Sequence, residues 1–352
     1  MLIKYTFTIM VYWQKLLNKG KLYTQFARSL LANRFLFWSI YVINTKLRYK
    51  FDALYYGLLI NKNSQANLYN FRRNIHRLEK GLSYQHIKSL FAEDYIWETV
   101  YYLKEDEELG LFDANTKKWG ESVLDLYFQT CQHSDKIREA YELYQTIKYE
   151  TNESNCLDWI PYTSDSRPAL SINYEALYQL ALRRRSIRFY LKNEVDPVLI
   201  KKAMDVAALS PSACNRQSFK YLFFNEKRLV KEIAQIPGGV TGYEIPSVVV
   251  VIGSYRGYFD ERDINAPLID SSLSVMAFLF ALETLGLSSV CINWPNLPDR
   301  EKKMRQLIYL EPDEFIVMLI GVGYPFSEGK IPYSAKRSIE NLIMVNERII
   351  KN

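Results

Sequence analysis

The chain has 352 residues, 48% of them apolar and 24% charged, a globular composition that excludes the disordered, collagen-like and disulfide-dense classes. Its length allows two domains or one elaborated domain. The formal net charge of +6 is unevenly spread, because residues 1–51 hold nine Lys or Arg and no Asp or Glu. The remaining residues hold 36 basic and 39 acidic side chains, so the excess positive charge belongs to the N-terminal segment.

Residues 1–52 combine these cations with large apolar side chains, as in the run from Phe35 to Ile43. Neither this run nor the run from Phe7 to Trp13 reaches the roughly 20 residues of a membrane-spanning helix. The pattern suits an amphipathic segment on a membrane surface, or a solvated basic face on helices that pack against the rest of the chain. It has no nucleic-acid-binding signature, so we expect no nucleic-acid partner.

Four cysteines and three histidines are scattered without metal-ligand spacing. We therefore expect no metal site and no disulfide framework. This cysteine usage fits a reducing compartment. We expect a cytoplasmic protein, and peripheral contact at the inner membrane face through residues 1–51 stays open as one of the two alternatives for that segment.

Residues 53–165 predict a mostly helical accessory domain. Four apolar residues recur there at helical spacing: Leu68, Phe71, Ile75 and Leu78. Four basic residues recur on the opposite side: Arg73, His76, Arg77 and Lys80. This basic row is either a solvated face or a binding surface for an anion. We expect Gly81 to cap the helix, and a second helix from Glu121 to Tyr149.

Residues 166–352 predict mixed α and β structure. Short β-rich runs at 221–224, 248–252 and 315–320 are separated by helical stretches. Between them, Val275 to Leu282 is wholly apolar in a helical context that ends at Gly286. A helix that is apolar on every side must be buried, in a core or in a subunit interface.

Four segments of this region carry chemistry. Arg183-Arg184-Arg185-Ser186-Ile187-Arg188 could hold a phosphate through charge-assisted hydrogen bonds, although such clusters also occur on ordinary surfaces. Ser210–Gln217 offers amide side chains that both donate and accept, as the edge of a flat heterocycle requires, or it is a plain helix end and turn. Gly321–Pro325 is a tight turn after a buried strand, and Ala335–Glu340 holds two more cations.

The order and spacing of these segments resemble the FMN-dependent nitroreductase family over about residues 174–343. Arg184–Arg188 is similar to the family's Arg-x-Ser-x-Arg opening. Pro211, Ser212, Asn215 and Gln217 match its Pro-Ser-x-x-Asn-x-Gln-Pro-Trp segment, with Ser218-Phe219 in place of Pro-Trp. Asp270–Gly286 resembles its central dimer helix, Gly321–Pro325 its Gly-x-Gly-x-Pro turn, and Lys336–Glu340 its closing Arg-Lys-Pro-Leu-Glu.

This resemblance implies an α+β fold: a nitroreductase-like mixed sheet flanked by helices, with a long buried central helix, preceded by the mostly helical N-terminal region. It implies a homodimer with FMN at the interface, bound by residues 166–352. The residues that it places on the cofactor are Arg184, Arg185, Ser186, Arg188, Pro211, Ser212, Asn215, Gln217, Gly323, Lys336 and Arg337. Which of the last two meets the phosphate stays open.

Cys291–Asn296 departs from the Gly-rich segment whose backbone approaches flavin N5 in many relatives. Asn293 or Trp294 could still supply a backbone donor, whereas Pro295 has no N–H. Trp294 would either stack on the flavin or substrate, or lie in the core.

We therefore expect an FMN-dependent oxidoreductase, in which NADH or NADPH reduces bound FMN and FMN reduces a small organic acceptor in a ping-pong cycle. The basic row Arg73, His76, Arg77 and Lys80 favours an anionic acceptor. The alternative is a catalytically degenerate nitroreductase-like scaffold or binding protein, docked to a membrane surface or an assembly through its basic N-terminus.

Overall fold

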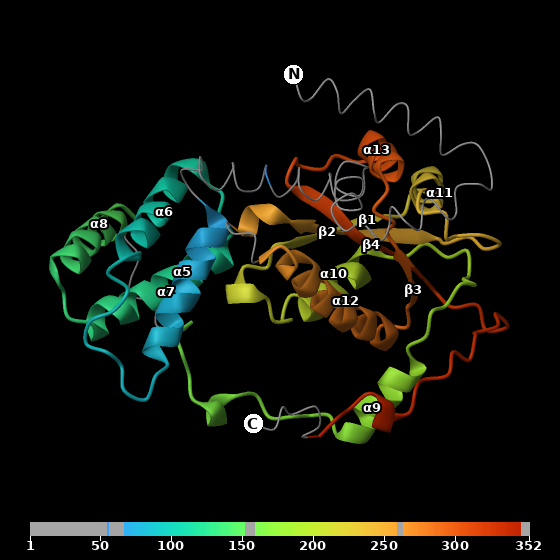
Figure 1. The fold of residues 1–352 in the computed structure, drawn as a ribbon, viewed down its shortest axis with the longest axis horizontal. Coiled ribbons are helices and arrows are strands. Elements are labelled where there is room, and N and C mark those ends of the chain that lie inside the picture. Colours follow the sequence, from blue (N-terminus) through green and yellow to red (C-terminus); the bar gives the residue numbers. More distant parts are fainter. Residues whose placement is uncertain (1–54, 56–66, 152–158, 259–262, 346–352) are drawn as a thin grey trace, which may run out of the picture.

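The computed structural model describes residue 55 and residues 67–151, 159–258 and 263–345 (Figure 1). The basic segment 1–52, with its expected membrane contact, lies outside the described residues. The described part of the chain has a helical cluster, residues 67–151, and an α+β region, residues 174–345. The predicted α+β fold class is confirmed, with the helical part first in the sequence.

The helical cluster packs α5 (Leu68–Leu82), α6 (Ile96–Leu109), α7 (Ala114–Thr130) and α8 (Asp135–Thr151) around one hydrophobic core. α5 begins after Asn67, whose side chain accepts hydrogen bonds from two backbone N–H groups of the first turn. The predicted apolar stripe faces inward, since Phe71, Ile75 and Leu78 are fully buried. The amphipathic pattern of α5 therefore fixes which side meets the core.

Two local predictions in this cluster are wrong. Gly81 does not cap α5, which continues to Leu82 and ends at Ser83. A Cβ at Gly81 would lie 2.3 Å from the Phe91 ring, so the glycine permits a close approach of two segments. The single helix predicted from Glu121 to Tyr149 is two helices, α7 and α8, which are separated by residues 131–134.

The α+β region is built on four strands in the order β1 (Phe219–Phe224), β2 (Ser247–Ser254), β4 (Glu314–Gly323) and β3 (Ser288–Asn293). All three strand pairs are antiparallel. A parallel bridge between Ser186 and Ser289 at the β3 edge makes the sheet mixed. The three predicted β-rich runs lie in β1, β2 and β4, whereas β3 was not predicted.

Helices cover both faces of this sheet (Figure 1). α11 (Lys227–Gln235) and α13 (Pro298–Leu307) cover one face, and α10 (Pro197–Ala207) and α12 (Ala266–Thr284) cover the other. Because side chains alternate along a strand, Val248 and Val250 pack under α11 and α13, while Val249 and Val251 pack under α12. β2 is buried along its whole length, which explains its unbroken apolar sequence.

α12 is the predicted long central helix. It spans Ala266–Thr284, and Gly286 lies beyond its end with a φ of 76°. Among the described helices, α12 alone is long and apolar enough to cross a membrane. However, 56% of its apolar 18-residue stretch is buried inside the protein, as in a core helix. One stripe remains uncovered, because Ile269, Leu273 and Met276 are exposed.

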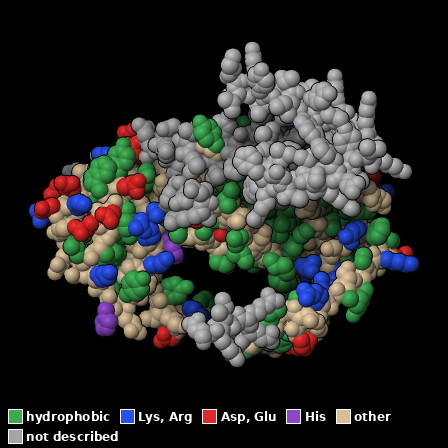
Figure 2. All heavy atoms as spheres, in the orientation of Figure 1, with side chains coloured by type: hydrophobic (Ala, Val, Ile, Leu, Met, Phe, Trp, Pro, Cys, Tyr) green, Lys and Arg blue, Asp and Glu red, His purple; other side chains and the backbone are tan. Residues whose placement is uncertain are grey.

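Two arms extend from the α+β region (Figure 1). α9 (Tyr174–Arg183) buries none of its residues, and residues 331–345, with the short 3-10 helix η5 (Ile339–Asn341), are exposed throughout. Both arms expose large apolar side chains, including Leu177, Tyr333 and Ile343. Figure 2 shows an open gap between the helical cluster and these arms. Three more 3-10 turns are η1 (Ser164–Ser166), η2 (Ala213–Asn215) and η3 (Tyr255–Gly257).

Candidate functional site

The segment Arg184–Arg188 runs along the β3 edge of the sheet. Its backbone is held there by the Ser186–Ser289 bridge and by the Ile187 N–H, which donates to the Ser289 carbonyl at 3.0 Å. Ile187 is buried and anchors the segment. In an extended chain every second side chain shares a side, so the spacing predicts Arg184, Ser186 and Arg188 on the side opposite Ile187. Two guanidinium groups would then flank one hydroxyl.

Arg184 is the unusual member of this segment. Its Nε is buried and has no hydrogen-bond partner among the described residues. The neighbouring Arg183 pairs with Glu283 at 3.3 Å near the end of α12. Burial raises the pKa of Glu283, against the opposing charges of Arg183 and Arg184. A buried guanidinium donor without a partner costs about 1–3 kcal/mol or more, which an anionic ligand would recover.

The second predicted segment, Pro211–Gln217, lies beside the start of α12. The Ala213 N–H donates to the Asp270 carboxylate at 3.0 Å, and the Gln217 N–H donates to the Ser212 hydroxyl at 3.1 Å. Pro211, Ser212 and Ala213 also line a shallow hollow of about 210 Å³, together with Ile269, Asp270 and Leu273 of α12. Polar backbone and small side chains thus border an apolar surface.

The backbone of this segment is strained. Cys214, Asn215 and Gln217 have φ values of 53°, 51° and 53°, which is the left-handed region that non-glycine residues seldom adopt. Such residues cost of order 1–3 kcal/mol each, and they persist where surrounding contacts hold them. They concentrate at ligand sites, so the strain is consistent with a binding role.

One chain does not bring the two segments together. Ala213 bonds to Asp270 near the start of α12, whereas Arg183 pairs with Glu283 near its end. These two anchors are thirteen positions apart along the helix, which corresponds to roughly 20 Å at 1.5 Å per residue. The two predicted flavin segments therefore lie at opposite ends of the same helix, and we refer to Arg184–Arg188 as the first half-site and to Pro211–Gln217 as the second half-site.

The remaining predicted cofactor residues are scattered. Gly323 ends β4, where an added Cβ would lie 2.4 Å from Pro246 and 2.8 Å from the Tyr190 ring, so its observed role is close packing. Lys336 and Arg337 lie in the exposed C-terminal arm, where Arg337 donates to the Asn341 carbonyl at 3.0 Å.

Asn293 and Trp294, the two candidates for a backbone donor near flavin N5, differ in burial. Asn293 is the exposed last residue of β3. Trp294 is only 5% exposed and packs in the hydrophobic core beneath α11 and α13. Of the two alternatives for Trp294, the structure therefore shows core packing.

The basic row of α5 borders the second half-site, because α5 packs against η2. Burial lowers the pKa of Arg73, and the charges of Arg77 and Arg216 lower it further. Arg77 lies over the Tyr95 ring at 3.6 Å from the ring centroid, and His76 is 3.5 Å from Glu79. Lys80 is exposed at the end of the row. An aromatic face and one carboxylate thus offset part of the repulsion within the row.

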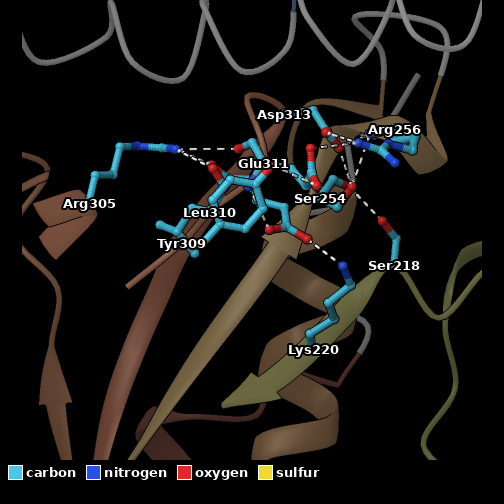
Figure 3. Close-up of polar contacts among 10 residues, drawn as sticks. Ser218, Lys220, Ser254, Arg256, Arg305, Tyr309, Leu310, Glu311 and Asp313 are labelled. Atoms are coloured by element: carbon cyan, nitrogen blue, oxygen red, sulfur yellow. Dashed lines mark hydrogen bonds and ion pairs between the residues drawn. The ribbon is translucent and has the colours of Figure 1, made fainter. Parts of the chain in front are cut away.

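A polar network that was not predicted from the sequence lies at the end of the sheet where β1 and β4 begin and β2 ends (Figure 3). It joins the residue before β1, the end of β2 and the start of β4. The Ser218 hydroxyl donates to the Ser254 carbonyl, and Arg256 pairs with Asp313 at 2.8 Å. Lys220 pairs with Glu314 at 2.6 Å. No short motif marks these residues, because their pairing arises only when the strands align.

Asp270 was also missed as a functional residue. It is 3% exposed on an apolar helix, and its Oδ2 accepts hydrogen bonds from the Ala213 N–H and from the Tyr258 hydroxyl at 2.8 Å. The available signal was an acidic residue in the first half of a mostly apolar helix, since a buried carboxylate must have partners. Within the described residues, no group of three or more His, Cys, Asp or Glu is arranged to hold a metal ion.

The chain matches one family model and is similar to several known proteins. The nitroreductase family model matches residues 181–241 and 239–324. A protein of Archaeoglobus fulgidus, provisionally named NADH dehydrogenase/NAD(P)H nitroreductase, is 24% identical over 157 residues, which are 44% of this chain and 88% of that protein. An NADH dehydrogenase of Thermus thermophilus is 27% identical over 183 residues, covering 42% of this chain and 86% of that protein.

Among solved structures, an FMN-dependent nitroreductase of Clostridium difficile is 20% identical. The match covers 47% of this chain and 97% of the solved chain, with a TM-score of 0.40. The residues matched by the family model fall in the α+β region.

Proposed function

We propose that the C-terminal half of this chain, which matches the nitroreductase family model over residues 181–241 and 239–324, is an oxidoreductase domain of that type that binds FMN and uses NADH or NADPH as electron donor. The observation that carries the proposal is Arg184, whose buried Nε has no hydrogen-bond partner among the described residues. A phosphate oxygen suits this donor, since guanidinium groups bind phosphate with two directed hydrogen bonds. The residues therefore fit the cofactor.

The proposed cofactor residues divide between the half-sites. Arg184, Arg185, Ser186 and Arg188 would hold the phosphate end and part of the ring. Pro211, Ser212, Asn215 and Gln217 would border the ring system, and Lys336 or Arg337 would close on the phosphate from the C-terminal arm. Asn293 and Trp294 are the candidates for the backbone donor near flavin N5. When bound, FMN supplies the two-electron redox chemistry of a ping-pong cycle.

We propose a homodimer with FMN at the interface, because the half-sites need a second copy. Two α12 helices packed antiparallel about a two-fold axis would bring the start of one beside the end of the other. The Ser212 segment of one chain would then face the Arg184 segment of its partner. The exposed stripe Ile269, Leu273 and Met276 and the apolar arms supply surface for this contact.

Within this assembly we propose residues 53–165 as the accessory domain and 166–352 as the cofactor domain. The acceptor is a small organic molecule, and the row Arg73, His76, Arg77 and Lys80 beside the second half-site favours an anionic one. Replacing Arg73 with Met should raise the KM for anionic acceptors and leave neutral acceptors unchanged. Equal effects on both classes would remove the anion from the proposal.

The direct test is FMN titration of Arg184→Met with Arg183→Met as the matched control. Arg183 is the adjacent arginine, 64% exposed at its side chain and paired with Glu283. Losing a charge-assisted hydrogen bond costs about 1.5–3 kcal/mol, so Arg184→Met should bind FMN about tenfold or more weakly. Arg183→Met should stay within about threefold of the unmodified protein. Equal FMN dissociation constants for both variants would contradict the assignment of Arg184.

A further inference from the structure

α5 of the helical cluster contacts the proposed flavin segment directly through Arg72. The Arg72 Nε donates to the Asn215 carbonyl at 3.0 Å, across 143 residues of sequence. Its Nη1 donates to the Thr116 hydroxyl on α7 at 2.7 Å, and its guanidinium lies 5.0 Å from the centre of the Trp119 ring. The side chain is thus held by the helical cluster and directs its Nε donor at the flavin segment.

The recipient of that bond is the strained part of the segment. Asn215 lies between Cys214 and Gln217, and all three have positive φ. The Asn215 N–H donates to the Ser212 carbonyl at 3.0 Å, which closes the turn from one side. Arg72 holds the turn from the other side, at the Asn215 carbonyl. Strained backbone persists only where such contacts over-determine it.

A second contact secures α5 one turn earlier. Tyr69 packs over η3, where a Cβ built on Gly257 would lie 3.5 Å from Tyr69 Cγ. Burial raises the pKa of Tyr69, while the positive charge of Lys220 lowers it and the negative charge of Asp313 raises it. Lys220 and Asp313 belong to the polar network shown in Figure 3. Tyr69 and Arg72 are three residues apart and so share a face of α5. The helix is therefore docked at two points on one end of the sheet.

We propose that Arg72 is a positioning residue, through which the helical cluster holds the Ser212–Gln217 turn in its flavin-binding form. The proposal rests on the proposed function, and it assigns the helical cluster a role in the cofactor site. Thr116 has the matching role on the cluster side, since its hydroxyl orients the guanidinium and in turn bonds to Asp113 at 2.8 Å. Binding of FMN then depends on the docking of α5.

The test compares Arg72→Met, Arg72→Lys and Thr116→Val in the full chain, with Arg228→Met as the control. Arg228 lies exposed on α11 and pairs with Glu232 at 2.9 Å. The first readout needs no flavin: the rate at which a small maleimide modifies Cys214, followed by mass spectrometry of its peptide. The buried Cys131 in the core of the helical cluster reports general loosening in the same sample.

We expect Arg72→Met to accelerate Cys214 modification several-fold while Cys131 stays at its original rate. FMN should bind about tenfold more weakly to Arg72→Met, as the loss of a hydrogen bond from a charged donor predicts. Arg72→Lys should fall between Met and the unmodified protein, because an ammonium group lacks the fork that reaches both partners. Thr116→Val should shift both readouts in the same direction by less.

An unchanged Cys214 rate in Arg72→Met would overturn the positioning role, as would equal acceleration of Cys214 and Cys131. If the unmodified protein bound no FMN, the proposed function would fail, and the Cys214 rate would still decide whether Arg72 holds the turn. If FMN bound to Arg72→Met with its original dissociation constant, the proposed function would survive and the role of Arg72 would not.

Discussion

Removing the Asp270 carboxylate should destabilise the start of α12 and the turn that it supports. Asp270 is 3% exposed, and one of its oxygens accepts from both the Ala213 N–H and the Tyr258 hydroxyl. In Asp270→Ala both donors lose their acceptor, at about 1–3 kcal/mol each. Burial raises the pKa of Asp270, so removing the charge recovers part of its desolvation cost. The expected net loss is therefore near the lower end, about 2 kcal/mol.

Asp270→Asn separates the oxygen from the charge. The amide oxygen can accept both bonds, because both go to a single oxygen of Asp270. This variant should lose less than about 1 kcal/mol. Ser272→Ala, on the exposed side of the same helix, is the matched control.

The assay is urea unfolding followed by circular dichroism, in flavin-free protein so that ligand binding does not contribute to the free energy of unfolding. A loss below about 0.5 kcal/mol for Asp270→Ala would refute this account of the turn. An Asn variant as unstable as the Ala variant would show that charge, and not the accepting oxygen, stabilises the turn.

Three further predictions follow from packing, interface and charge. Gly323→Ala should lose about 1–3 kcal/mol in urea unfolding because its Cβ would meet Pro246, while Gly239→Ala, with its nearest atom 3.9 Å away, should be neutral; equal losses would contradict the packing argument. Met276→Glu should lower the sedimentation coefficient from that of a dimer to that of a monomer, because it places a charge in the exposed apolar stripe of α12. An unchanged sedimentation coefficient would show that this face of α12 is not the dimer interface. Partial burial tends to raise the pKa of Asp113, but hydrogen bonds at Thr116 and the charge of Arg72 outweigh it and lower the pKa. The stability from Asp113 is then present above its ordinary pKa of 3.8 and is lost as the pH falls through the lowered value. Asp113→Asn should flatten the acid limb of the melting temperature, and an unaltered acid limb would refute this.

The sequence pattern predicted the structure correctly where that structure depends on residues within a single helix or strand. The stripe of Phe71, Ile75 and Leu78 predicts α5 and its buried face, and apolar runs predict three of the four strands. It failed where a distant contact decides. Gly81 is required by Phe91, and the break between α7 and α8 contains no Gly or Pro, but the Gln132 N–H there donates to the Ser89 carbonyl at 2.8 Å.

The candidate site shows the same division. The motifs locate Arg184–Arg188 and Pro211–Gln217, but only the fold reveals that they lie at opposite ends of α12. Strand order and helix direction set that separation, and neither can be read from motif spacing. Arg72 was missed because its partner, Asn215, lies 143 residues away in the sequence. Asp270 carried a readable signal, since a carboxylate on an apolar helix needs buried donors.

We propose that this chain is a working flavin oxidoreductase of nitroreductase type. The most direct measurement is anaerobic mixing of the FMN-loaded protein with NADH and, separately, NADPH, while the visible absorbance of bound flavin is followed. A working flavin enzyme should be bleached by at least one nicotinamide, and its absorbance should recover when an acceptor is added. Bound flavin that neither nicotinamide bleaches, or a protein that retains no flavin, would contradict it.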